Sequence, residues 1–483
     1  MAAFMSLATI RTDVPARLDR LPWARWHWMI VIGLGTVWIL DGLEVTIVGN
    51  LSGRLSEQGS GLDITQSQVT GLGAAMYVAG ACVGALFFGW LTDRYGRKKL
   101  FMITLGVYLF GTAMTALSFH AWWFFLFRFI TGAGIGGEYA AINSAIDELI
   151  PAKHRGRIDL VINGTYWAGA AFGALLTVPI LTQLPVSWGW RVAFGLGVVL
   201  GLVILLVRRH VPESPRWLFI HGRGDEAEAL VRGVEEEVER EDRVTLDPVD
   251  TTIEIHQRKT IGFGTIAKTL VTRYPKRSAL GLALFIGQAF LYNAITFGYA
   301  QILQTFFKVP SGNTGYYFAA IAVGNLLGPL LLAPLFDSIG RKVMITGTYV
   351  ISGVLLLGTA WLFGHGALNA TTMTACWCVV LFFASAGASS AYLTVSEIFP
   401  METRALAIAF FYAVGTAAGG ITGPLLFSHL VGTGQVGDTV TAFVIGAIVM
   451  IAGGLVEAVL GVRAERRSLE EIATPLTATD ART

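Results

Sequence analysis

The stretch Gly89-Trp-Leu-Thr-Asp-Arg-Tyr-Gly-Arg-Lys-Lys99 decides the fold, because its charged core occurs a second time late in the chain. The second copy is Ala333-Pro-Leu-Phe-Asp-Ser-Ile-Gly-Arg-Lys342, and both stretches contain the pattern Asp-x-x-Gly-Arg-Lys. Each lies in a short basic loop that directly follows a long apolar segment. A loop repeated at corresponding places in two hydrophobic halves indicates a duplicated membrane domain, and such domains commonly move solutes across the bilayer.

The composition agrees with a membrane protein. Of the 483 residues, 54% are hydrophobic and only 14% are charged, whereas soluble proteins carry about 25% charged residues. The net charge of +2 gives no reason to expect a nucleic-acid partner. Cys82, Cys376 and Cys378 lie within apolar runs, which indicates buried hydrophobic residues and no disulfide framework. The histidines show no metal-ligand spacing, so we expect neither a metal nor a cofactor.

Twelve apolar segments are long enough to cross a bilayer as helices, which takes about 20 residues each. They lie near residues 27–50, 69–91, 99–119, 122–147, 158–182, 190–208, 278–306, 315–336, 342–363, 371–395, 403–429 and 439–462. Lysine and arginine gather in alternate loops, while the opposite loops, such as Ser118 to Ala121, are almost free of them. The positive-inside rule therefore predicts that the basic loops and both termini are cytoplasmic.

A long polar segment divides the twelve segments six and six. We expect an N-terminal cytoplasmic segment at 1–26, a six-helix bundle at 27–208, a cytoplasmic linker with short helices at 209–277, a second six-helix bundle at 278–462 and a cytoplasmic tail at 463–483. The linker is too short for an independent catalytic domain. The predicted class is an all-α membrane protein with two pseudo-symmetric bundles, and a bacterial inner membrane is its expected location.

Several motifs resemble those of the major facilitator superfamily, in its sugar-porter-like branch. They are the paired Asp-x-x-Gly-Arg-Lys loops, Arg128 followed by Glu148 and Arg155, Pro212-Glu-Ser-Pro-Arg-Trp-Leu218, and Ser396-Glu-Ile-Phe-Pro-Met-Glu-Thr-Arg404. The resemblance covers about residues 25–473. One stretch, Asp41-Gly-Leu-Glu-Val-Thr-Ile-Val-Gly49, is more similar to the organic-acid/proton symporters and the synaptic vesicle protein 2 relatives than to true sugar porters. The resemblance implies two bundles around a central cavity that opens alternately to each side.

Charged residues within the predicted helices are candidates for proton coupling. Asp41 and Glu44 lie in the first helix and Arg128 in the fourth, where an unpaired charge costs at least ~2.5–3.5 kcal/mol. Asp41 and Glu44 are three residues apart and share a helix face. The resemblance places Glu44 at the acidic residue of proton-coupled sugar porters and Arg128 at its arginine partner. Either an arginine that moves loads and releases a proton, or a static ion pair joins the two helices. Glu138, also in the fourth helix, is a further candidate for which the family offers no role, and it could equally be a hydrated charge along the cavity.

Five uncharged polar residues are candidates for substrate binding. The resemblance places them where sugar porters line the substrate cavity: Asn163, Gln288, Asn293, Asn325 and Tyr392. Amides offer both donors and acceptors, which suits hydroxyl groups, carboxylates or ring nitrogens equally. Taken singly, each amide could equally serve hydrogen bonding between helices.

A third set of charged residues lies in the predicted cytoplasmic loops and could form a gate. The set comprises Asp93, Arg97, Glu148, Arg155, Glu213 and Arg216 in the first half and Asp337, Arg341, Glu397 and Arg404 in the second. Ion pairs between helix ends can stabilise one closed arrangement and break in another. Exposed pairs contribute only ~0.2–1 kcal/mol each, so a gate needs a network of them.

These observations predict a secondary transporter, and not an enzyme, because no nucleophile, metal site or nucleotide loop occurs in a suitable context. We expect a proton-coupled symporter that imports a small polar organic solute, either a sugar or polyol or a small organic acid. The alternatives are an uncoupled facilitator, an exporter, or a transport-dead receptor or scaffold. The expected partners are the solute, the proton and the lipid bilayer, and we expect a monomer.

Overall fold

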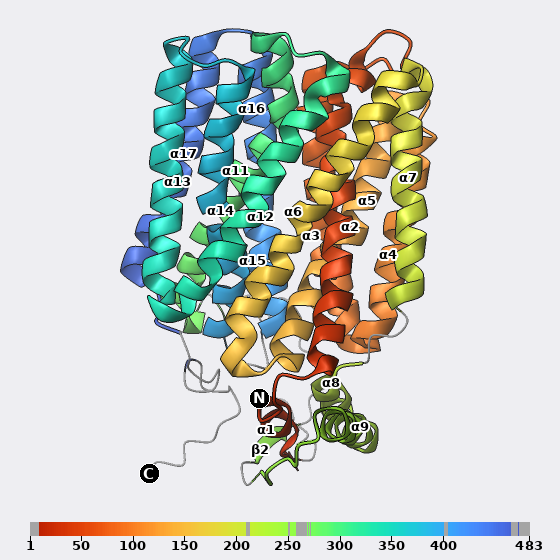
Figure 1. The fold of residues 1–483 in the computed structure, drawn as a ribbon, viewed down its shortest axis with the longest axis vertical. Coiled ribbons are helices and arrows are strands. Elements are labelled where there is room, and N and C mark those ends of the chain that lie inside the picture. Colours follow the sequence, from red (N-terminus) through yellow and green to blue (C-terminus); the bar gives the residue numbers. More distant parts are fainter. Residues whose placement is uncertain are drawn as a thin grey trace.

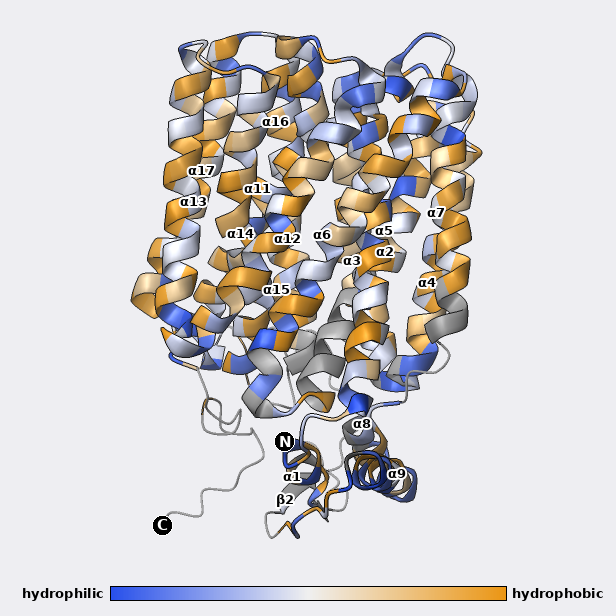
Figure 2. Cartoon of the chain, viewed as in Figure 1, coloured by the Kyte–Doolittle hydropathy of each residue, from blue (hydrophilic) through white to orange (hydrophobic). Residues whose placement is uncertain are grey.

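Two bundles of long, roughly parallel helices lie side by side in the computed structural model, and the short helices at 14–19, 215–220 and 224–242 lie together at one end of them (Figure 1). The structure describes residues 9–208, 213–249, 252–256, 268, 270, 272–399, 404–464 and 472. We call the end with the short helices, which carries Lys98, Lys99, Arg341 and Lys342, the basic end, and the opposite end the far end. Hydrophobic residues cover the length of the bundles, whereas hydrophilic residues gather at both ends and on the helix at Gly224–Asp242, α9 (Figure 2).

The first bundle contains six helices. They are α2 (Arg25–Ser56), α3 (Ala74–Tyr95, after the π-helical turn η1 at Gln68–Gly73), α4 (Arg97–Ala116), α5 (Ala121–Leu149), α6 (Ala152–Gln183) and α7 (Val186–Arg208). The second bundle repeats the arrangement with α11 (Pro275–Phe307), α12 (Thr314–Ser338, after the 3₁₀ turn η2 at Ser311–Asn313), α13 (Arg341–Gly364), α14 (Ala370–Ile398), a helix formed by α15 (Arg404–Thr416), η3 (Ala417–Ile421) and α16 (Thr422–Gly432), and α17 (Val436–Leu460).

Eleven of these helices are long and apolar enough to cross a membrane over their described residues. The 29-residue helix α5 is the twelfth. The prediction of an all-α membrane protein with twelve membrane helices is therefore confirmed. Several helices are longer than their apolar segments: the first was predicted at 27–50 but ends at Ser56. The apolar segment reflects the thickness of the hydrocarbon layer, while a helix can continue beyond it because its backbone groups stay paired within the helix.

Glycine sets how closely the helices of a bundle approach each other. In the contact between α3 and α5, a Cβ added to Gly84 would lie 2.0 Å from the carbonyl oxygen of Ala133. A Cβ added to Gly136 would lie 1.9 Å from the carbonyl oxygen of Ala81. Larger residues at these two positions would force the helices apart. Membrane helices gain contact in this way because lipid provides no hydrophobic force to press them together.

A small polar layer covers the basic end below the first bundle (Figure 1). It contains α1 (Val14–Asp19), α8 (Pro215–Ile220), α9 (Gly224–Asp242) and an antiparallel pair of strands, β1 (Thr9–Thr12) and β2 (Ile253–His256). Arg17 of α1 donates to Glu235 of α9 over 2.9 Å and also pairs with Glu228. The start of the chain is thus attached to the segment that joins the two bundles, a contact that the sequence analysis did not predict.

Candidate functional site

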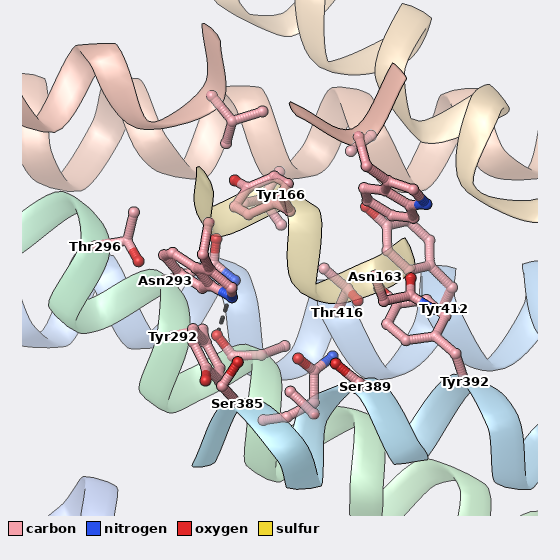
Figure 3. Close-up of a pocket in the computed structure, with 18 of the residues that line it drawn as sticks. Asn163, Tyr166, Tyr292, Asn293, Thr296, Ser385, Ser389, Tyr392, Tyr412 and Thr416 are labelled. Atoms are coloured by element: carbon pink, nitrogen blue, oxygen red, sulfur yellow. Dashed lines mark hydrogen bonds between the residues drawn. The ribbon is translucent and has the colours of Figure 1, made fainter. Parts of the chain in front are cut away.

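A cavity of about 140 Å³ lies between the two bundles, and both halves contribute to its walls (Figure 3). The first half supplies residues from α2, α3 and α6, and the second half supplies residues from α11, α14 and α15. A cavity shared by two repeats is where membrane transporters bind their solutes. The fold therefore places the cavity where movement of one half against the other would change access to it.

Most of the described side chains that line the cavity are aromatic or polar, the others are small aliphatic residues, and none of them is charged. Eight are aromatic: Trp38, Tyr77, Tyr166, Trp167, Tyr292, Phe297, Tyr392 and Tyr412. Polar groups come from three amides and from the hydroxyl groups of Thr296, Ser385, Ser389 and Thr416. Apolar walls with a few convergent polar groups are typical of small-molecule sites, where the polar groups fix the orientation of the ligand.

Four of the five residues predicted to bind substrate line this cavity: Asn163, Gln288, Asn293 and Tyr392. The side-chain nitrogen of Asn293 donates to the carbonyl oxygen of Ala289 in its own helix over 2.8 Å, which leaves its oxygen to face the cavity (Figure 3). Gln288 is only 8% exposed. The amides that the sequence analysis selected from separate helices therefore do converge.

The fifth residue, Asn325, lies behind the cavity wall and is fully buried. Its side-chain oxygen accepts a hydrogen bond of 2.9 Å from the hydroxyl group of Tyr292, and Tyr292 lines the cavity. Helix α12 turns Asn325 away from the open space, and the residue supports the wall. The structure therefore places Asn325 outside the described cavity lining, and its contact with substrate stays a prediction.

Sequence reasoning missed most of the aromatic wall. A signal for it was present, because residues three or four apart share one face of a helix. Tyr166 follows Asn163 by three positions, and Tyr292 follows Gln288 by four. Tyr77 and Tyr412 have no predicted site residue beside them in sequence, so only the packing of the helices could reveal their place in the cavity.

The buried acid Glu44 lies next to the cavity wall but not in it. The Thr112 hydroxyl group on α4 donates to one carboxyl oxygen of Glu44 over 2.9 Å. The other carboxyl oxygen has no hydrogen-bond partner and lies against Gly197 of α7, where an added Cβ would approach it to 2.0 Å. Glycine at position 197 thus makes the space that the carboxyl group of Glu44 occupies.

The predicted partner, Arg128, is fully buried in α5, yet it forms no ion pair with Glu44 within 4.0 Å. None of its three guanidinium nitrogens has a hydrogen-bond partner. The guanidinium carbon lies 4.7 Å from the centre of the Tyr77 ring and 6.0 Å from that of Phe194. A cation is attracted to the face of an aromatic ring, so these rings provide its contacts. Asp41 and Glu138 are also buried in this half.

Of the predicted gate, the structure describes the side chains of four residues. In the second half, Arg341 donates to Asp337 over 2.9 Å and to both carboxyl oxygens of Glu397 over 3.0 and 3.2 Å. This network joins the basic ends of α12, α13 and α14. The bidentate contact between Arg341 and Glu397 is a stronger geometry for an ion pair than a single hydrogen bond. All three residues belong to one half, so these contacts brace that half.

In the first half, Glu213 contacts the loop that opened the sequence analysis. Its carboxylate accepts a hydrogen bond of 3.2 Å from the backbone nitrogen of Lys98, in the first turn of α4. A negative charge is stabilised at the start of a helix, where free backbone N–H groups point outward. The other six predicted gate side chains lie outside the described part of the structure: Asp93, Arg97, Glu148, Arg155, Arg216 and Arg404.

Hydrogen bonds between described side chains of the two halves occur at the far end, and we call this group the far-end latch. Tyr299 of α11 donates to Asn50 of α2, and Ser311 donates to Glu57. Gln301 accepts a hydrogen bond of 2.8 Å from Thr70 and donates one of 2.9 Å to Ser67. Side-chain hydrogen bonds therefore connect the two halves at the far end of the structure.

No group of three or more His, Cys, Asp or Glu side chains that could hold a metal occurs in the described part of the chain. The sequence matches the family described as sugar (and other) transporters over residues 25–476. The niacin transporter NiaP of Acinetobacter baylyi is 27% identical, with 95% of this chain and 99% of NiaP covered. The glucose transporter GlcP of Staphylococcus epidermidis is 26% identical, with 89% and 96% covered.

Among solved structures, the proton:xylose symporter XylE with bound 6-bromo-6-deoxy-D-glucose superposes with a TM-score of 0.72 at 19% sequence identity, and the match covers 92% of this chain and 98% of XylE. An inward-open structure of XylE from Escherichia coli has a TM-score of 0.64. These relatives and structural neighbours are transporters and not enzymes. With twelve membrane helices, a cavity shared by two repeats and a family match over most of its length, the chain is an integral membrane protein that belongs to the sugar (and other) transporter family of the major facilitator superfamily.

Proposed function

We propose that this protein is a proton-coupled importer of a small polar organic solute. The observation that carries the proposal is the place of Glu44 and Arg128, which are buried directly behind the wall of the central cavity and do not pair with each other. A buried carboxyl group that an arginine can approach or leave is suited to take up and release a proton. XylE, a proton:xylose symporter with the same fold, supports the same chemistry.

The direction of access follows from charge and from the far-end latch. The basic end carries the clustered lysine and arginine residues, so we place it and both termini in the cytoplasm by the positive-inside rule. The far-end latch then closes the cavity toward the outside. Movement of one half against the other would break the far-end latch and open the cavity outward. We place the protein in the inner (cell) membrane of a bacterium, because the two relatives named above are bacterial transporters.

The cavity favours a ring-shaped solute that carries no net charge when bound. Its described lining offers eight aromatic side chains, three amides and several hydroxyl groups, but no charged group that would pair with an ionised solute. A sugar or polyol is therefore our first candidate. An aromatic acid such as niacin, bound in its neutral form, is the second candidate, because the aromatic walls suit a flat ring and NiaP is a relative.

Uptake into proteoliposomes tests the proposal. Purified protein is reconstituted, an inward-directed proton gradient is imposed, and labelled xylose, glucose and niacin are supplied in parallel. We expect one of them to accumulate above its external concentration and the accumulation to collapse with a protonophore. Uptake that only equilibrates would show a facilitator, and gradient-driven efflux would show an exporter. Absence of both transport and counterflow with every solute would favour the receptor or scaffold reading.

A binding measurement can reduce the number of candidate solutes before transport is measured. A true substrate stabilises the folded state by mass action, by about 2.7 kcal/mol at a concentration of 100 times its Kd. The thermal midpoint of detergent-solubilised protein is measured with sugars, polyols and pyridine acids. We expect Gln288→Ala to remove the shift, because this amide lines the cavity. A shift that survives in this variant would mean that the solute binds elsewhere.

A further inference from the structure

We propose that Tyr77 couples the occupancy of the cavity to the proton on Glu44. This inference rests on the proposed function and deepens it, because it names the residue through which substrate and proton sense each other. Tyr77 touches neither the proton nor its carboxyl group. It acts through Arg128, so it is a positioning residue.

The geometry places Tyr77 between the cavity and the buried cation. Its side chain lines the cavity, and the residue is only 4% exposed. Its ring also lies 4.7 Å from the guanidinium carbon of Arg128. The ring of Phe297, on α11 of the second half, lies 6.3 Å from the ring of Tyr77. One aromatic ring therefore contacts the cavity, the buried cation and the opposite half.

The cation depends on this ring because it has so few other contacts. The guanidinium group of Arg128 lacks a hydrogen-bond partner on every nitrogen, and its second ring contact, with Phe194, is longer at 6.0 Å. A cation–π contact is stronger when both groups are out of water, where estimates reach about 2 kcal/mol or more. Movement of Tyr77 would remove this contact. Among the carboxyl groups around Arg128, that of Glu44 has the largest electrostatic effect on it.

A solute in the cavity would pack against the ring of Tyr77 and hold it under Arg128. Arg128 then stays away from Glu44, and Glu44 keeps its proton. When the cavity empties, the ring is free to move, Arg128 reaches Glu44, and the carboxyl group releases its proton to water as it becomes a carboxylate paired with the guanidinium group. The structure shows Arg128 on the ring of Tyr77 and without an ion pair to Glu44.

The proposed coupling between solute binding and protonation of Glu44 can be measured, because thermodynamic coupling is reciprocal. If the solute favours the protonated form of Glu44, protonation must strengthen solute binding by the same factor. Other titratable groups face the same region: Asp41 on α2, Tyr108 on α4, Glu138 on α5 and Tyr166 on α6. Among these described titratable groups and Arg128, Arg128 is the one with a cation–π contact to the ring of Tyr77. Loss of the ring should therefore change the position of Arg128 more than the positions of the other groups.

The test compares Tyr77→Leu with Tyr77→Phe, in the proteoliposomes described above and with xylose, glucose and niacin measured in parallel. For the wild type, we expect apparent solute affinity to fall with rising pH, by up to tenfold per pH unit for one coupled proton. In Tyr77→Leu, we expect accumulation to fall to equilibrium while counterflow continues, and the pH dependence of affinity to flatten. Tyr77→Phe keeps the ring and should restore both.

Tyr412→Leu is the matched control, because Tyr412 lines the same cavity from the second half. It should weaken affinity by the same factor at all pH values and lower uptake and counterflow together, whereas Tyr77→Leu should lose accumulation and keep counterflow. If Tyr77→Leu does not fold, Tyr77→Met replaces it. Tyr77→Phe is a test by itself, because its apparent solute affinity must depend on pH as that of the wild type does. Full accumulation with an unchanged pH profile in Tyr77→Leu would overturn the inference. Absence of proton-driven accumulation in the wild type would instead overturn the proposed function beneath it.

Discussion

The two halves of the molecule share one arrangement of helices but carry different chemistry around the cavity. The first half places the charged residues Glu44 and Arg128 behind the wall. The second half faces the cavity with the amides of Gln288 and Asn293 and carries no charge there. It does contain a buried acid, Glu457 in α17, but that residue does not line the cavity. The difference suggests that proton coupling belongs to one half and solute recognition mainly to the other.

The structure describes a different contact at each of the two duplicated basic loops. At the first, the backbone at the start of α4 binds Glu213, which lies between the two bundles in sequence. At the second, the side chain of Arg341 binds Asp337 and Glu397 of its own bundle. The side chains of Asp93 and Arg97, their counterparts in the first loop, lie outside the described part of the structure. The described contacts therefore attach the linker at the first loop and brace three helices at the second.

The largest expected effect comes from Glu44→Gln, which should abolish accumulation while counterflow survives. Glutamine keeps the shape and the hydrogen bond with Thr112 but cannot carry the proton. Glu457→Gln makes the same change at a buried acid of the other half and should leave accumulation intact. Both are measured by uptake and counterflow in proteoliposomes. Equal loss of uptake and counterflow in Glu44→Gln would make Glu44 a structural residue, and loss of accumulation in Asp41→Asn alone would transfer the proton to Asp41.

The next effect concerns the space that holds Glu44. Gly197→Ala would place a Cβ 2.0 Å from the second carboxyl oxygen, so the carboxyl group must move. We expect accumulation to fall at least about tenfold, with a loss of stability of about 1–3 kcal/mol from overpacking. Gly195→Ala, on the same helix, is the control, because an added Cβ there meets nothing within 4 Å. If both variants accumulate solute like the wild type, the close contact at Gly197 is unimportant.

The sequence predicted the twelve helices because each needs its own long apolar segment, which is a local property. It also predicted which amides face the cavity, apart from Asn325, whose orientation depends on the rotation of α12 and on the hydroxyl group of Tyr292. The contact of Arg128 with Tyr77 joins two helices through a ring that carries no charge, so no charge pattern marks it. The pairing of β1 with β2 joins segments more than 200 residues apart and has no local signal.

A third prediction separates recognition from coupling. Gln288→Ala should weaken solute binding by about 1–3 kcal/mol, because it leaves a solute group unpaired. Accumulation at saturating solute should remain, since Glu44 and Arg128 are untouched. Asn293→Ala should cost less, because its amide nitrogen is already paired with Ala289 of the same helix. Apparent affinity and the accumulation ratio are measured together. Unchanged affinity in both variants would exclude α11 from the binding site.

A smaller effect is expected where the halves meet. Tyr299→Phe removes the hydrogen bond to Asn50 in the far-end latch, a contact with a net contribution of about 0.5–1.5 kcal/mol. The outward-open population should therefore rise about two- to tenfold. Spin-label distances between the far ends of α2 and α11 report this change. Tyr316→Phe is the control, because Tyr316 lies on the surface near the far end of α12. Equal distance distributions in both variants would show that this contact does not hold the halves closed.

The smallest expected effect lies outside the membrane, where α1 is attached to α9. Burial of Glu235 opposes its charge, but hydrogen bonds from Arg17 and Arg20 outweigh this and hold the pKa of Glu235 below its ordinary value of 4.5. A carboxyl group with a lowered pKa stabilises the folded contact at pH values above its ordinary value, and the stabilisation is lost as the pH falls through the lowered value. The attachment of α1 should therefore be constant from pH 7 to about pH 5 and weaken below about pH 4.

Hydrogen–deuterium exchange of residues 14–19 in nanodiscs, corrected for the intrinsic effect of pH, measures this attachment. Glu235→Gln should show fast exchange already at pH 7 and little further change on acidification. Glu226→Gln is the matched control, because Glu226 lies on the same helix but pairs with the exposed Arg223. Helix α1 directly precedes the first membrane helix, α2. If proton coupling resides in Glu44, Arg128 and Tyr77, as we propose, release of α1 from α9 should leave accumulation unchanged. A loss of accumulation in Glu235→Gln would instead show that coupling extends beyond the cavity wall to the basic end.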